Sequence, residues 1–437
     1  MTIVSSSYDC GPIGDIWTKI AAIATNFVLY WTFHPQYQTD LSNAGHAIWT
    51  GLQQDVLSVP FPYPEAANWT IREQIERRGY LYEEHDITTE DGFILKAFRV
   101  PGKASEDINA NQFKQPVIMQ HGLIDDAGTW FFNNASLDLS LELVDLGFDI
   151  WATNSRGSAY SNRHVKYTVD VDAFWNFTVN EMGKYDVPAN VHYVLNTTGF
   201  AKVIWIGHSQ GTTQWFIANA LDLNLAQYFK GFVGVGPAMY VYNQNAVLVN
   251  TLQLLEVPDI LVCYVDSFLY VPGFNEIGTI FLHSFPRFIW NFVQTVVGFD
   301  KNLHLDLGML PMMGQNDVGG TSTKNLFHWV QMMRAGYFQQ FDYGTAEANW
   351  REYGQSTPPQ YNTDSFKTNL ANVPIFLIAG ANDALVQPSD YDKLISLLPS
   401  SAKSKVIADY NHLDYMWAAD SNEYVNKDVI DFIKTLQ

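Results

Sequence analysis

The stretch AKVIWIGHSQGTTQWFIANAL, residues 201–221, holds an apolar run, two glycines around Ser209 and a second apolar run. This pattern predicts a buried strand, a sharp turn at Ser209 and a helix. Residues 207–211 fit the G-x-S-x-G pattern of a nucleophile elbow, whose glycines relieve crowding at the turn. A match this short arises by chance in about one chain in ten of this length. The rest of the chain must therefore support it.

Strand patterns alternate with helical patterns on both sides of this stretch. A hairpin turned at Asp91 and Gly92 is expected within residues 81–100, and short buried strands are expected at 116–122 and 374–380. This alternation predicts an α/β fold with a mostly parallel central sheet flanked by helices. The alternation fails between about 239 and 364, where we expect an inserted, mainly helical cap over the strand ends.

The first 59 residues are expected to be an extension, followed by the α/β domain over 60–437. Residues 35–70 contain several prolines and are interpreted as a linker. Residues 16–33 are mostly apolar with helical spacing, which suits a helix on a membrane or one packed on protein. We favour membrane attachment of some kind. No positively charged segment precedes this helix, so a signal peptide is poorly supported.

The composition limits the classes of function. Of 437 residues, 47% are hydrophobic and 16% charged, which is typical of a globular protein with a large core. A net charge of −20 argues against binding to nucleic acid or to anionic lipid headgroups. The two cysteines, Cys10 and Cys263, are expected to be free thiols, and we expect no metal or cofactor. Four N-x-[ST] sites favour a secretory route: Asn68, Asn134, Asn176 and Asn196.

A serine on such an elbow needs an acid and then a histidine later in the chain. His412 follows a predicted strand directly, on a loop at the end of the strand where ligands meet such sheets. Asp383 follows the buried strand before it and is the best candidate for the acid. Three other acids in this region are expected to have capping, solvated or strand positions: Asp390, Asp392 and Asp409.

The oxyanion hole of such a site is built from backbone N–H groups. One donor is the residue after the nucleophile, which is Gln210, and the other comes from the loop after an earlier strand. The loop in MQHGLIDDAGTW places Leu123 for this role. His121 in the same loop is interpreted as a structural residue and not as a second base.

Several long motifs, in order, resemble the acid lipases, the family of gastric, lysosomal and steryl-ester lipases. They include PEAANWTIREQIERRGYLYEEHDITTEDGFIL, GHSQGTTQWFIA, PIFLIAGANDALVQP and YNHLDYMWA. The resemblance extends from about residue 60 to the end of the chain. It implies an α/β-hydrolase fold with a helical cap, and hydrolysis of fatty acyl esters of neutral lipids. It also matches Ser209, Asp383 and His412 to the catalytic residues and Leu123 and Gln210 to the oxyanion donors.

The resemblance further implies a lid near residues 271–300, whose aromatic character suits a lipid–water interface. The expected partner is a neutral lipid ester at such an interface or a membrane. The first 60 residues have no counterpart in the family, and a lone Cys263 in the cap weakens a secreted placement. Lysosome-like, secreted and membrane-anchored locations stay open. Acyl transfer on the same triad, or an anchored structural subunit, are the alternatives to hydrolysis.

Overall fold

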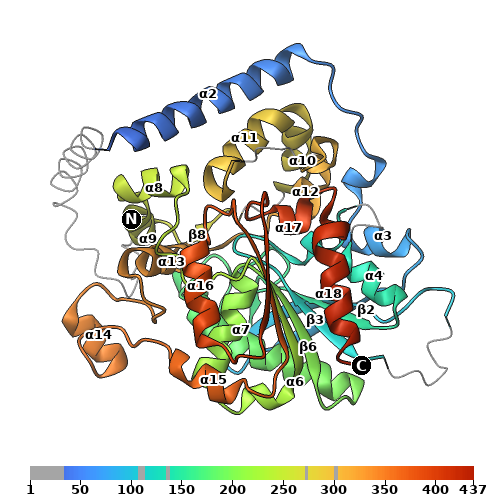
Figure 1. Ribbon diagram of the computed structural model, residues 1–437, viewed down its shortest axis with the longest axis vertical. Helices are drawn as coiled ribbons and strands as arrows, with labels where there is room; N and C mark the ends of the chain where they lie inside the picture. Colours follow the sequence, from blue (N-terminus) through green and yellow to red (C-terminus); the bar gives the residue numbers. More distant parts are fainter. Residues whose placement is uncertain (1–33, 107–113, 134–137, 271–273, 300–303) are drawn as a thin grey trace.

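The computed structural model describes residues 34–106, 114–133, 138–270, 274–299 and 304–437. A mixed nine-stranded sheet lies at its centre (Figure 1). Its strands lie in the order β1-β2-β4-β3-β6-β7-β10-β11, and β5 pairs with β2. The bounds are β1 Glu83–Thr88, β2 Phe93–Val100, β3 Pro116–Gln120, β4 Asp149–Thr153, β5 Arg163–His164, β6 Val203–His208, β7 Phe229–Val235, β10 Ile375–Gly380 and β11 Lys403–Ile407.

Neighbouring strands pair in parallel along the row β4-β3-β6-β7-β10-β11. Strand β2 pairs antiparallel with β1, β4 and β5. The β1–β2 hairpin turns beside Asp91 at Gly92, whose φ of +102° favours glycine. The predicted hairpin and the mostly parallel sheet are therefore confirmed.

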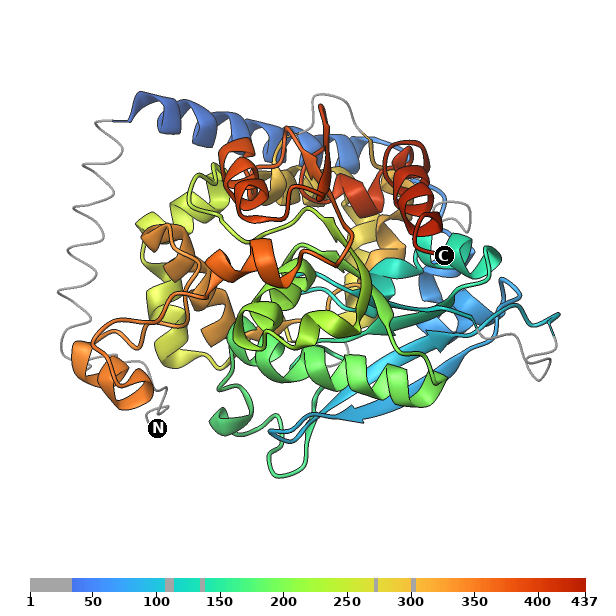
Figure 2. The ribbon, with the colours of Figure 1, turned by 60° about the horizontal axis from the view of Figure 1, so that its bottom comes forward.

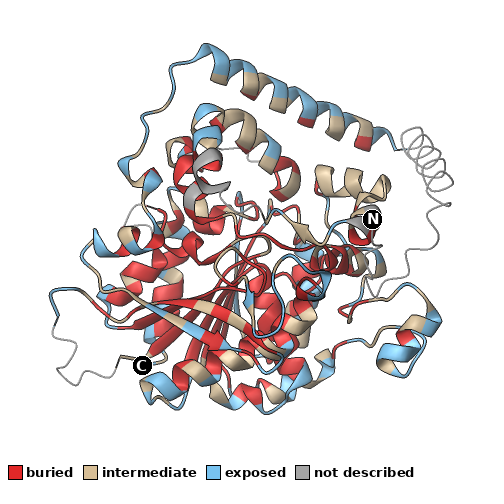
Figure 3. Cartoon of the chain, turned by 180° about the vertical axis from the view of Figure 1, so that it is seen from behind, coloured by how far each residue is buried: buried red, intermediate tan, exposed pale blue. Residues whose placement is uncertain are grey.

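Two apolar cores cover the two faces of the sheet, because successive side chains of each strand point to opposite sides. Trp205 of β6 packs in one core, with α6 and α7, and its neighbours Ile204 and Ile206 pack in the other. Figure 3 shows the strands as the most buried part of the chain. The flanking helices are α3 Ile71–Glu76, α4 Leu139–Asp145, α5 Val179–Glu181, α6 Val187–Thr198, α7 Gln210–Leu221, α15 Phe366–Asn369, α16 Pro388–Leu397, α17 Asp414–Trp417 and α18 Lys427–Lys434.

The segment 239–364 is mainly helical and covers one end of the sheet (Figures 1 and 2). Its only described strands, β8 Ser267–Phe268 and β9 Thr321–Ser322, pair antiparallel with each other. The helices are α8 Val247–Leu254, α9 Val257–Tyr264, α10 Phe274–Ser284, α11 Pro286–Val297, α12 Leu310–Asn316, α13 Thr323–Ala335 and α14 Ala346–Tyr353. The exact limits of this cap stay a prediction.

The linker interpretation of residues 35–70 is wrong for its first part. Residues Pro35–Leu57 form α2, a 23-residue helix that lies across α8 and α11 (Figures 1 and 2). Pro35 occupies the start of this helix, where a missing N–H costs nothing. Pro60, Pro62 and Pro64 follow the end of α2 and leave the helix uninterrupted.

The expectation of free thiols is also wrong, because Cys263 is disulfide-bonded. The chain has one other cysteine, Cys10. The predicted apolar helix at 16–33 lies outside the described residues. Among the helices that the structure describes, none combines the length and the apolar character needed to cross a bilayer.

Candidate active site

Ser209 lies on a tight turn between β6 and α7, with φ +49° and ψ −118°. Both flanking glycines are needed there. A Cβ on Gly207 would lie 2.7 Å from the carbonyl oxygen of Gly211, and a Cβ on Gly211 would lie 2.3 Å from that of Gln120. The backbone N–H of Ser209 donates to the carbonyl of Val235 at 3.0 Å. The turn is therefore held in a conformation that non-glycine residues seldom adopt.

The structure brings Ser209, His412 and Asp383 together from three different loops. The Oγ atom of Ser209 lies 2.7 Å from Nε2 of His412. The other ring nitrogen, Nδ1, lies 2.7 Å from Oδ2 of Asp383. Because a carboxylate only accepts, Nδ1 carries the proton and Nε2 is left to accept the serine proton. This arrangement can activate the serine hydroxyl as a nucleophile.

Asp383 is held by donors on both of its oxygens. Its Oδ1 accepts the backbone N–H groups of Leu385 and Val386, each at 2.9 Å. Its Oδ2 also accepts the hydroxyl of Tyr415 at 3.1 Å. Burial and the adjacent carboxylate raise the pKa of Tyr415 well above its usual value, so the hydroxyl keeps its proton. Tyr415 was not predicted from the sequence.

The three alternative acids lie outside the hydrogen-bond chain of Ser209, His412 and Asp383. Asp390 accepts the backbone and side-chain N–H groups of Asn243, at 2.9 and 2.8 Å. Asp392 and Asp409 are exposed.

Two further histidines support the site without serving as bases. Nε2 of His208 lies 3.2 Å from the carbonyl of His412. Burial and the nearby His412 ring lower the pKa of His208 to about 3, so this ring is a neutral donor. His121 bridges the Gly122 carbonyl, at 2.9 Å, and the Ser155 N–H, at 3.0 Å. Both of its nitrogens are therefore used by the backbone, and burial lowers its pKa.

The loop after β3 runs directly beside Ser209. A Cβ built on Gly122 would lie 3.4 Å from the Cβ of Ser209, and Leu123 is the next residue of this loop. Gln210 begins α7, and its side-chain oxygen accepts from Asn325 and Trp329 of α13, each at 2.9 Å. The oxyanion roles of Leu123 and Gln210 stay predictions.

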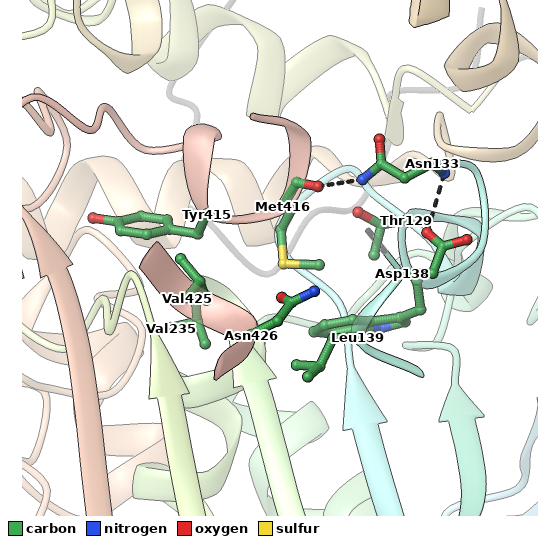
Figure 4. Close-up of a pocket in the computed structure, with 10 residues that line it drawn as sticks. Thr129, Asn133, Asp138, Leu139, Val235, Tyr415, Met416, Val425 and Asn426 are labelled. Atoms are coloured by element: carbon green, nitrogen blue, oxygen red, sulfur yellow. Dashed lines mark hydrogen bonds between the residues drawn. The ribbon is translucent and has the colours of Figure 1, made fainter. Parts of the chain in front are cut away.

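The three central side chains are shielded from solvent. Ser209 is 9% exposed, His412 3% and Asp383 0%. A small cavity nearby, with room for about one water, has Tyr415 and Met416 among the residues that line it (Figure 4). Asn133 crosses its edge and donates to the Met416 carbonyl at 2.6 Å. None of the three central residues lines this cavity, so it belongs to the scaffold.

Comparison with known proteins places this geometry in context. Two family models match the chain: a partial α/β-hydrolase lipase region over residues 71–134, and the α/β hydrolase fold over residues 115–258. Among solved structures, carboxylesterase CesB from Bacillus subtilis matches 90% of this chain and 98% of its own, at 13% identity and a TM-score of 0.46.

Curated relatives are similar over most of their length. "Putative lysosomal acid lipase/cholesteryl ester hydrolase" of Crotalus adamanteus is 35% identical over 381 residues, which cover 86% of this chain and 92% of that protein. Gastric triacylglycerol lipase of Homo sapiens is 34% identical, over 83% of this chain and 90% of that protein. Human lipase member K is 33% identical, over 84% and 91%.

Proposed function

Because this chain belongs to the acid lipase family of α/β-hydrolases, we propose that it cleaves fatty acyl esters through Ser209, His412 and Asp383. Membership makes the protein a carboxylic ester hydrolase that acts on neutral lipids. The catalytic roles rest on one observation, the continuous chain of 2.7 Å contacts from the serine to the histidine and on to the aspartate.

The first half of the reaction forms an acyl-enzyme. Nε2 of His412 takes the proton of Ser209 as Oγ bonds to the ester carbonyl carbon. The carbonyl oxygen becomes an oxyanion, which the backbone N–H groups of Leu123 and Gln210 stabilise. The C–O bond to the alcohol then breaks, and the imidazolium gives its proton to the departing alkoxide. Asp383 stabilises the imidazolium and holds the ring orientation.

The second half releases the fatty acid. His412 takes a proton from water, whose oxygen attacks the acyl carbon. The tetrahedral intermediate collapses, the bond to Oγ breaks, and the proton returns to Ser209. Transfer of the acyl group to a sterol or diacylglycerol in place of water would use the same steps. Product analysis with such an alcohol present distinguishes transfer from hydrolysis.

The proposed substrates are long-chain esters presented at a lipid surface. Large apolar side chains are exposed on the cap helices, namely Ile280 (62%) and Phe281 (46%) on α10 and Phe292 (46%) on α11. Exposed apolar groups of this kind suit contact with lipid. A panel of triacylglycerols and steryl esters of graded chain length would rank the two substrate classes, both of which occur in the names of the relatives.

Replacement of the nucleophile tests the proposal directly. Ser209→Ala is expected to lower kcat for p-nitrophenyl butyrate by on the order of 10⁴-fold or more, because no other group can form the acyl-enzyme. A fluorophosphonate probe should label the wild type and not the variant. Ser140→Ala is a matched control, because the Ser140 hydroxyl donates to the Trp130 carbonyl within the scaffold. Equal rates for the wild type and Ser209→Ala would refute the proposal.

We further propose that the protein enters the secretory route, to a lysosome-like or extracellular location. The disulfide at Cys263 favours an oxidising compartment. Three of the four glycosylation motifs present exposed asparagines, at Asn68, Asn176 and Asn196. The gastric and lysosomal names of the relatives agree with such a route. A mass decrease after endoglycosidase treatment of protein from eukaryotic cells would support it, and an unmodified chain would contradict it.

A further inference from the structure

Helix α2 places a carboxylate at the start of α11, although Asp55 and Arg287 are 232 positions apart in the sequence. The Asp55 side chain is fully buried, with 0% of its surface exposed. Its Oδ2 accepts the backbone N–H of Phe288 at 2.8 Å. Its Oδ1 accepts the backbone N–H of Arg287 at 3.3 Å and the guanidinium Nη1 of the same residue at 3.1 Å. Three donors thus converge on one buried carboxylate.

Helix α11 has no side-chain cap of its own. The residue before it is Phe285, whose side chain has no hydrogen-bond acceptor. The first N–H groups of a helix lack partners within the helix, and the helix dipole favours a negative charge beside them. Asp55 meets both needs from a different helix.

The opposite end of α11 holds two of the three proposed catalytic loops. The carbonyl of Val297, its last residue, accepts the backbone N–H of Ala384 at 3.0 Å and that of His412 at 3.3 Å. Ala384 directly follows Asp383. One carbonyl at the end of α11 therefore joins the loop that carries Asp383 (the acid loop) to the loop that carries His412 (the base loop).

The next two residues reinforce this junction. The Gly298 carbonyl accepts the side-chain N–H of Asn411 at 3.4 Å, and the Phe299 carbonyl accepts that of Asn382 at 2.6 Å. Gly298 has φ +117°, and a Cβ there would lie 2.3 Å from the Asn382 carbonyl oxygen. The end of α11 thus fits closely against the acid loop.

We propose that Asp55 is a positioning residue of this hydrolase, which acts on His412 and Asp383 through α11. This inference rests on the triad roles proposed above. A helix of this length spans about 18 Å and moves as a rigid element, so loosening its first turn shifts its last carbonyl. Serine attack tolerates little displacement, since a shift of about 1 Å can cost on the order of 10²-fold in rate. Trp290 still anchors the inner face of α11, so a partial loss is expected.

A second contact between the same helices offers an independent test. A Cβ on Gly51 of α2 would lie 2.6 Å from Nδ2 of Asn291 and 2.8 Å from the Arg287 carbonyl oxygen. The same Asn291 Nδ2 donates to the Ala47 carbonyl at 2.8 Å. Gly51→Ala should therefore push α2 away from α11. Gly45→Ala on the same helix is the matched control, because a Cβ there meets nothing within 4 Å.

The test measures kcat and KM on soluble p-nitrophenyl butyrate, with the active-site concentration titrated by a fluorophosphonate. We expect Asp55→Ala and Gly51→Ala to lower kcat per titrated site by about tenfold, with KM changed less than about twofold. Asp55→Asn keeps one acceptor oxygen and should lie between the wild type and Asp55→Ala. Gly45→Ala, and Asp40→Ala, whose carboxylate bonds to Gln36 on its own helix, should match the wild type.

Hydrogen exchange of the backbone amides of Arg287 and Phe288 gives a readout that does not depend on activity. Faster exchange at these amides together with the lower kcat supports the proposal. Faster exchange with an unchanged or higher kcat overturns it, because α11 would then be loosened without moving the catalytic loops. If Asp55→Ala fails to fold, Gly51→Ala decides by the same criteria. Failure of the proposed function is distinguishable, because Ser209→Ala would then retain the activity of the wild type.

Discussion

The backbone of Ser209 is strained, and the residues around it are arranged to hold that strain. Its φ of +49° is uncommon for a side chain with a Cβ, and it persists because the turn is fixed by β6, α7 and the N–H bond to Val235. The sequence motif predicts this turn, since G-x-S-x-G describes the turn itself. It does not predict Tyr415, whose only signal is its position three residues after His412. A tyrosine there is equally compatible with plain core packing.

Removal of the Tyr415 hydroxyl should weaken catalysis more than folding. Tyr415→Phe deletes one of the donors to Asp383 and leaves the two backbone N–H groups in place. We expect kcat/KM to fall by about tenfold, corresponding to one hydrogen bond to a charged group. Tyr361→Phe is the control, since that buried hydroxyl donates to Asn180. Equal losses in kcat/KM for the two variants would contradict a specific role for Tyr415.

Among the elements, those with strong patterns were predictable and α2 was not. The strands β3, β6 and β10 are fully buried and mostly apolar, which is the pattern of short apolar runs that predicts buried strands. The buried positions of α2 are Tyr37, Ala44 and Gly51, seven residues apart and mostly small. Small side chains permit close helix packing but give almost no hydrophobic signal. Asp55 is not among these positions, although its side chain is covered, and its sequence context is that of an ordinary polar residue; its role is visible only with α11 beside it.

The contact between α12 and the loop after β3 should make stability depend on pH. Burial, followed by the neighbouring carboxylates of Asp125 and Asp126, raises the pKa of Asp317 well above its usual value. Thr129 bonds to the same carboxyl and opposes the shift. The folded state therefore keeps this proton when the unfolded chain, with a pKa of about 4, has lost it. The contribution of Asp317 to the free energy of unfolding is therefore fully present below the pKa of the unfolded chain. It is lost as the pH rises toward the raised pKa of the folded state.

Asp317→Asn removes the ionisable carboxyl, and with it the loss of stability at higher pH, while the amide keeps the size of the side chain and an N–H donor. We expect the variant to match the wild type near pH 4 and to be more stable at pH 7. Its advantage in free energy of unfolding should grow by up to about 1.4 kcal/mol per pH unit. Urea unfolding across this range measures it, with the exposed Asp392→Asn as control. An advantage that does not change with pH would count against the raised pKa.

At the scale of the whole molecule, the disulfide at Cys263 and the central sheet differ in how far the sequence predicts them. The disulfide at Cys263 lies in the cap, on α9, and the only other cysteine is at position 10. Sequence spacing alone could not show that Cys263 is disulfide-bonded, because disulfide formation depends on distances that only the folded chain defines. The alternation of strands and helices along the chain, by contrast, predicts a mostly parallel sheet, although not the order of its strands.

Reduction of this disulfide should lower stability without abolishing the fold of the sheet. Loss of a disulfide typically costs about 2–4 kcal/mol. We expect dithiothreitol to lower the melting temperature of the wild type, and Cys263→Ser to melt at that lower temperature with or without the reductant. Differential scanning calorimetry checks both. A wild-type melting temperature that does not respond to reduction would contradict the bond.

The shared carbonyl of Val297 has a consequence for how this protein can evolve. The acid loop and the base loop both donate a backbone hydrogen bond to the Val297 carbonyl oxygen. Substitutions near Asn382 and near Asn411 should therefore have effects on activity that do not add independently. A change that is harmful in one loop can be offset by a second change in the other, so the two loops are expected to covary among descendants. Proteins whose acid and base loops share one acceptor are expected to diverge by paired substitutions, one in each loop. Chimaeras that combine the acid loop of one lineage with the base loop of another should have lower esterase activity than either parent.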